Sequence, residues 1–109
     1  MRKVFIDECV DWRLLRSLAP HEVKTARQMG WSELKNGTLL REAAVQFDVF
    51  LSTDSGIEHQ NNIATIDIAV VILEPKRNKL SELLPLVPKL LEILPGVLPG
   101  TVTRVTSEN

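Results

Sequence analysis

Acidic side chains follow two short apolar runs of this 109-residue chain. Asp7 and Glu8 come directly after Val4-Phe5-Ile6, and Asp54 stands three residues beyond Val49-Phe50-Leu51. Carboxylates that lie close together repel one another, so they usually need a divalent cation, a shared proton or a basic partner. The pattern therefore predicts a small acidic site, and metal-assisted chemistry is the first chemistry to consider.

Both apolar runs are typical of strands that are buried on both faces of a sheet. Five strands are predicted in all: Val4–Ile6, Glu22–Thr25, Asp48–Ser52, Ile66–Leu73 and Thr101–Val105. The fourth has the strongest pattern and is placed centrally, whereas the last alternates like an edge strand.

At least one helical segment is predicted between each strand and the next, with two between the second and third strands: Val10–Leu18, Ala26–Met29, Asn36–Phe47, Ile57–Asn62 and Leu83–Leu94. Pro20 ends the first, Gly30 ends the second, Asn36 is the N-cap of the third, and Pro85 restarts the last. Alternating strands and helices predict one domain over residues 1–109, a three-layer α/β/α sandwich around a mostly parallel five-stranded sheet. Ligands bind outside the carboxyl ends of such strands, where Asp7 and Asp54 are expected.

Composition restricts the partners of this domain. Hydrophobic residues make up 44% of the chain and charged residues 25%, which is typical of a globular protein. The net charge of −1 gives no global basic field, so a nucleic acid would have to be held by local Lys and Arg or through a metal. One cysteine, no signal-peptide pattern and no apolar stretch long enough for a membrane predict a cytoplasmic protein without a membrane partner.

The chain resembles a PIN-like domain, found in a group of short bacterial proteins regarded as potential nuclease toxins of toxin–antitoxin systems. The stretches that carry the resemblance cover nearly the whole chain: Phe5–Cys9, His21–Thr25, Met29–Trp31, Lys35–Gly37, Phe47–Leu51 leading to Asp54, and Ile68–Val71. Their order and spacing carry the resemblance, since none of the motifs is specific by itself.

The resemblance implies an endoribonuclease, a hydrolase that cuts RNA with acidic residues holding Mg²⁺ or Mn²⁺. Asp7 and Asp54 match the catalytic and metal-binding aspartates after the first and third strands, and Glu8 is a further candidate metal ligand. Many relatives have two more aspartates, where this chain has Asn36 and Gly56. RNA, a cognate antitoxin and a second copy of the chain in a two-fold homodimer are the partners to expect.

Three other residues are candidates for substrate binding, and each also has a structural explanation. Asn36 could supply a carbonyl ligand or only cap a helix. Thr53 could bind phosphate or serve the turn after the third strand. His59, in the polar run His59–Asn62, could contact phosphates or bases, or lie on a solvated short helix.

Two alternative functions follow from the same residues. The chain could be a catalytically degenerate PIN-like module that binds a partner, using apolar surface on its leucine-rich segment Leu80–Leu98. It could instead be a receiver-like phosphoacceptor domain with Asp54 as the phosphorylated residue. Receiver domains carry a lysine after the fifth strand, and Thr101–Val105 contains none.

Overall fold

The computed structural model describes residues 1–107 and contains a five-stranded sheet. The strands are β1 (Lys3–Ile6), β2 (Glu22–Thr25), β3 (Val49–Ser52), β4 (Ala69–Glu74) and β5 (Val102–Thr106). Neighbouring strands are parallel throughout, in the order β2-β1-β3-β4-β5, which is the order of flavodoxin-like doubly wound sheets. The predicted α/β class is confirmed, and the sheet is wholly rather than mostly parallel.

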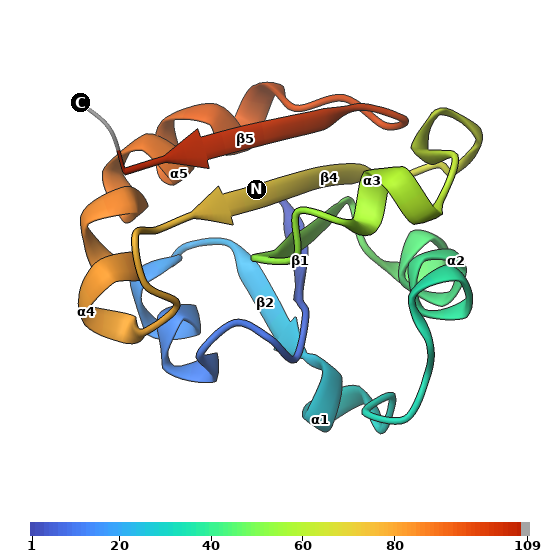
Figure 1. Ribbon diagram of the computed structural model, residues 1–109, viewed down its shortest axis with the longest axis horizontal. Coiled ribbons are helices and arrows are strands. Elements are labelled where there is room, and N and C mark those ends of the chain that lie inside the picture. The colour runs from blue at the N-terminus through green and yellow to red at the C-terminus, as the bar shows by residue number, and fades with distance from the viewer. Residues whose placement is uncertain (108–109) are drawn as a thin grey trace.

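Helical segments connect the strands and cover both faces of the sheet. The α-helices are α1 (Ala26–Met29), α2 (Asn36–Gln46), α3 (Ile57–Gln60), α4 (Leu80–Leu83) and α5 (Val87–Ile93). The 3₁₀ segments are η1 (Trp12–Ser17), η2 (Ile63–Thr65), η3 (Leu84–Leu86) and η4 (Leu94–Gly96). Helices α4 and α5 lie on one side of the sheet and α2 and α3 on the other, so the molecule has three layers (Figure 1).

The alternation of side chains along β1 divides the core into two halves. Val4 and Ile6 pack on the face covered by η1, α4 and α5, together with Leu14, Leu83 and Leu90. Phe5 points to the other face, where it packs with residues of α1, α2 and α3. Val4, Phe5 and Ile6 are all fully buried, which holds the end of this strand in place from both sides.

Three expected details of the helices are wrong. The first segment is a 3₁₀ helix, because the Leu14 and Leu18 amides bond to carbonyls only three residues back. The cap of α2 is Lys35 and not Asn36, since the Lys35 carbonyl accepts the Leu39 amide at 2.7 Å. The last predicted helix is four short segments, and proline stands in the first turn of three of them.

The fourth strand is shorter than its apolar run and lies next to the middle of the sheet. Ile66 and Ile68 are buried, but their amides close turns with the Ile63 and Ile66 carbonyls, so the strand begins only at Ala69. The expected interior position of β4 is confirmed, since it lies between β3 and β5, and β3 is the middle strand. The position of β5 at an edge is confirmed.

The leucine-rich segment mostly serves the core of the molecule itself. Leu83, Leu86, Leu90 and Leu94 are buried against the sheet, which leaves Leu98 as its most exposed leucine. Over residues 1–107, no helix combines the length and the apolar character that a membrane crossing requires. A docking surface on this segment stays a prediction.

Candidate functional site

The strand order brings the two predicted acids to one place in the sheet. β1 and β3 are neighbours, and Asp7 and Asp54 follow their carboxyl ends. The segment that leaves β1 packs on one face and the helices that lead into β3 pack on the other. This is the point where the winding of the sheet reverses, and open α/β sheets bind ligands in the crevice at such a point.

Ser52 joins the two acids through one buried hydroxyl group. The Ser52 side chain donates a hydrogen bond of 2.9 Å to Asp7 Oδ2 and accepts one of 3.0 Å from the Asp54 amide. The Asp7 amide also bonds to the Leu51 carbonyl of β3 at 2.9 Å, which continues the β1–β3 pairing one residue beyond the end of β1. The relative position of Asp7 and the Asp54 backbone is therefore fixed by hydrogen bonds within the site.

Asp7 is a nearly buried carboxylate with several donors around it. Asp7 is only 8% exposed, while Asp54 is half-buried. Asp7 Oδ1 accepts the Glu8 amide at 2.8 Å, and the Cys9 thiol lies 3.5 Å from Oδ2. The donors hold the carboxylate in one orientation at the end of β1.

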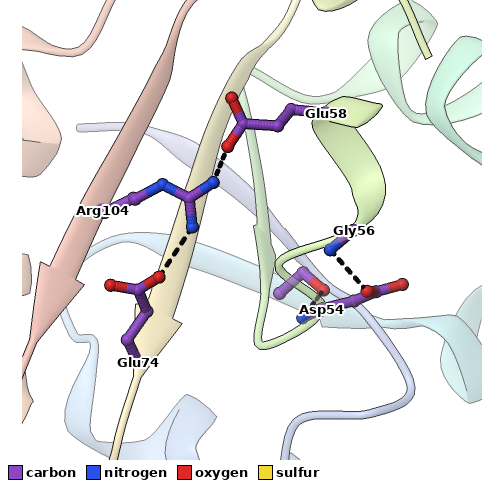
Figure 2. Close-up of polar contacts among 6 residues, drawn as sticks. Asp54, Gly56, Glu58, Glu74 and Arg104 are labelled. Atoms are coloured by element: carbon purple, nitrogen blue, oxygen red, sulfur yellow. Dashed lines mark hydrogen bonds and ion pairs between the residues drawn. The ribbon is translucent and has the colours of Figure 1, made fainter. Parts of the chain in front are cut away.

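Gly56 has a structural role in the turn that holds Asp54. Its amide donates a 2.9 Å hydrogen bond to Asp54 Oδ1, which Figure 2 shows as a tight turn. A Cβ atom at position 56 would lie 3.2 Å from the same oxygen, closer than most real contacts of this kind. A side chain at this position would require the Asp54 carboxylate to shift by a few tenths of an ångström.

The other predicted site residues are placed less favourably. The Glu8 side chain is exposed, and His59 is exposed on α3. Thr53 Oγ1 donates to the Cys9 carbonyl at 3.4 Å and accepts from Asn78 at 3.2 Å, so it ties the loops after β1, β3 and β4 together. The Asn36 side chain lies outside the described part of the structure.

The predicted metal ligands do not form a three-residue cluster. Over residues 1–107, no three His, Cys, Asp or Glu side chains gather closely enough to hold a metal ion. Asp7 and Asp54 therefore make a site of two carboxylates, in which any cation would depend on water and substrate for its remaining ligands.

An ion-pair network beyond Asp54 was missed from the sequence. Arg104 of β5 pairs with Glu74 of β4 at 2.7 Å and with Glu58 of α3, and Figure 2 shows its guanidinium between the two carboxylates. The network fastens α3, which follows the Asp54 turn, to the sheet. The alternation of β5 contained a signal, because Arg104 and the core residue Val105 must point to opposite faces.

Asp7, but not Asp54, lines a groove of about 1140 Å³. Its walls include Asp7 and Glu8, the exposed Trp12 and Arg16 of η1, and Arg27 of α1. We call it the Trp12 groove. It gives Asp7 an open approach from solvent along the carboxyl ends of β1 and β2.

The Asp11–Arg13 pair at the edge of this groove gives the chain a pH-dependent contribution to stability. Hydrogen bonds from the Arg13 side chain and amide lower the pKa of Asp11 from 3.8 to about 2. A lowered pKa stabilises the fold above the unfolded value near 3.8, and the stabilisation is lost as the pH falls toward 2. The pair faces solvent, so the effect is small and is screened by salt.

Comparison of wild type with Asp11→Asn tests this effect, because asparagine keeps the capping oxygen and removes the charge. Urea unfolding should show the wild type as the more stable protein at pH 5. The difference should close as the pH approaches 2 and shrink in high salt. A difference that is constant over this pH range would contradict a contribution from the charge.

Replacement of Ser52 by alanine is expected to lower the free energy of unfolding by about 1–3 kcal/mol. Ser52 is fully buried, and the change leaves Asp7 Oδ2 and the Asp54 amide each without its hydroxyl partner. Urea unfolding measures the loss. Ser55→Ala, an exposed position in the same turn, is the matched control and should stay within about 0.5 kcal/mol of wild type. Equal effects at the two positions would contradict the bridging role.

Fold and site together define a doubly wound, all-parallel α/β protein with two acidic residues, Asp7 and Asp54, joined through the Ser52 hydroxyl at the switch point of its sheet. Comparison of the chain with protein-family models, with curated proteins and with solved structures finds no match.

Proposed function

We propose that the chain is a metal-dependent endoribonuclease of the PIN-like type, with Asp7 and Asp54 as its catalytic carboxylates. The observation that carries the proposal is the Ser52 bridge, which holds both acids at the carboxyl ends of adjacent strands. The bridge joins the Asp7 carboxylate to the backbone of Asp54, so the two residues are neighbours at this edge of the sheet. The sequence resemblance supports the same reaction class and the toxin role within a toxin–antitoxin pair, with an antitoxin protein as partner.

The donor set of the site fits Mg²⁺ or Mn²⁺. Both candidate ligands are carboxylates, and hard divalent cations prefer oxygen ligands. Mg²⁺ is commonly bound by one or two carboxylates together with substrate phosphate and water, so a two-carboxylate site is sufficient. When bound, the ion would polarise a phosphoryl oxygen and lower the pKa of a water molecule.

The residues of the chain itself would position the ion and the substrate. Asp7 is kept in one orientation by the Glu8 amide and the Ser52 hydroxyl, and Asp54 by the Gly56 amide. Such preorganisation matters because the ligands need not rearrange during the reaction. The Trp12 groove opens onto Asp7 and provides a path for a substrate that is longer than the site itself.

The test is Mn²⁺ binding followed by RNA cleavage. Binding is measured as the loss of the electron paramagnetic resonance signal of free Mn²⁺ when the purified protein is added. Cleavage is measured with a labelled single-stranded RNA as substrate. We expect both at millimolar Mn²⁺. Binding without cleavage would point to the degenerate module, and absence of both would exclude the proposed function.

A receiver-like phosphoacceptor is the second candidate, because the strand order 2-1-3-4-5 is also that of receiver domains. Asp54 would be the phosphorylated residue. The fifth strand supplies Arg104, but its guanidinium is already paired with Glu58 and Glu74. Treatment with acetyl phosphate and mass spectrometry of the intact chain distinguishes the two candidates, since only a receiver gains a phosphoryl group at Asp54.

A further inference from the structure

Trp12 is the most unusual side chain on the wall of the Trp12 groove. It is 54% exposed, although tryptophan is a large apolar residue that proteins mostly bury. Arg16, one helical turn further along η1, lies over the ring with its guanidinium carbon 5.6 Å from the ring centroid. The indole is therefore held by a cation–π contact and still presents much of its surface to solvent.

The charges of the groove are arranged in two parts. Asp11 binds the Arg13 guanidinium through two hydrogen bonds of 3.0 and 2.7 Å, so this pair is internally neutralised. Among residues 1–107, neither Arg16 nor Arg27 forms an ion pair. Two unpaired guanidinium groups thus stand on the walls formed by η1 and α1, and Asp7 lines the same groove.

The size of the groove indicates an extended ligand. Pockets that enclose drug-sized molecules measure roughly 300–1,000 Å³. The Trp12 groove exceeds that range and is open to solvent along its length. A polymer with regularly spaced anionic groups and flat rings matches a wall that offers guanidinium groups beside an exposed indole.

We propose that Trp12 is a base-stacking platform for one unpaired nucleotide of a single-stranded nucleic acid, and that Arg16 and Arg27 contact its phosphates. The phosphate next to the stacked base would then lie in the part of the groove that Asp7 lines. This inference rests on the proposed function for the identity of the polymer. It adds the residue that positions the strand, since stacking on an aromatic side chain tolerates any base but requires an unpaired one.

Binding is measured by fluorescence anisotropy in EDTA, with a labelled oligouridylate and with the same RNA annealed to its complement. We expect the wild type to prefer the single strand. Trp12→Ala should weaken single-strand binding roughly 5- to 150-fold, and Trp12→Phe should retain most of it. Inorganic polyphosphate, which has charges but no bases, should compete equally with wild type and Trp12→Ala. Trp12 is exposed, so its removal should leave the unfolding transition near that of wild type.

Leu98→Ala is the matched control, since Leu98 is 63% exposed and lies before β5, at the opposite end of the sheet. It should bind RNA as the wild type does. Unchanged affinity of Trp12→Ala, or equal affinity of wild type for single strand and duplex, would overturn the inference even if the protein cleaves RNA. Trp12-dependent binding in EDTA without cleavage in Mn²⁺ would instead uphold the inference and exclude the nuclease.

Discussion

Asp7→Asn is expected to weaken Mn²⁺ binding and to lower the rate of RNA cleavage by on the order of a hundredfold or more, while the fold is kept. Changes to groups that only support a ligand already cost 10- to 100-fold in metal affinity or activity. Removal of a ligand charge should cost at least as much. The asparagine amide has nearly the shape of the carboxylate, so it can still accept the Glu8 amide and meet the Ser52 hydroxyl.

The structure also permits a purely structural role for Asp7, and the two roles predict opposite results. If Asp7 only satisfies its donors, asparagine largely replaces it, and both unfolding and Mn²⁺ behave as they do with wild type. If Asp7 is a ligand, unfolding changes little and Mn²⁺ no longer binds. Asp67→Asn, the same substitution at an exposed position before β4, is the matched control and should leave cleavage unchanged. Equal cleavage by wild type and Asp7→Asn would exclude the proposed catalytic role.

The placement of the two acids could be predicted from sequence because it depends on strand ends. Apolar runs before Asp7 and Asp54 are long enough to identify strands, and the carboxyl ends of parallel strands share one edge of a sheet. β2 was predicted with the right bounds, and α1 with its end at Gly30, which has φ +75°. Local turn chemistry was sufficient at these positions.

Contacts between distant residues were beyond sequence reasoning. The Ser52 bridge joins Asp7 to a residue 45 positions away, and a serine at the end of a strand has no pattern that announces this role. The sequence marks Gly56 as the place of a missing carboxylate and as a turn residue, but it does not show that the Gly56 amide orients Asp54. Arg104 pairs with Glu74 across 30 residues. Such partners depend on strand order, which hydrophobic periodicity does not specify.

The strongest apolar pattern was also misleading in one respect. The run Ile66–Leu73 was expected to be a strand over its whole length, but Ile66 and Ile68 are buried while their amides bond within turns. Burial of a side chain and membership of a strand are separate requirements. Burial needs only a position in the core, whereas a strand also needs a neighbouring strand to bond its backbone groups. Hydrophobic periodicity indicates burial and not strand pairing.

The largest expected effect on stability is that of Phe5→Ala, which should lower the free energy of unfolding by about 3–5 kcal/mol. Phe5 of β1 is fully buried. The centroid of its ring lies 5.5 Å from the ring centroids of Trp31 and Phe47 and 5.4 Å from that of Phe50. Removal of the ring leaves a cavity at the centre of this cluster. Domains of this size are stable by about 5–15 kcal/mol, so the variant should be close to unfolding at room temperature.

Urea unfolding followed by circular dichroism measures this loss, and Val45→Ala on α2 is the control. Val45 is 80% exposed, so its truncation should change the free energy of unfolding by no more than about 0.5 kcal/mol. A similar small effect at Phe5 would show that the aromatic cluster does not hold α2 against β1.

Because Val4 and Ile6 anchor β1 only from the opposite face, the position of Asp7 at its end depends on Phe5 as well. A Phe5→Leu variant that stays folded should therefore lose Mn²⁺ affinity as well as stability if the proposed site is correct.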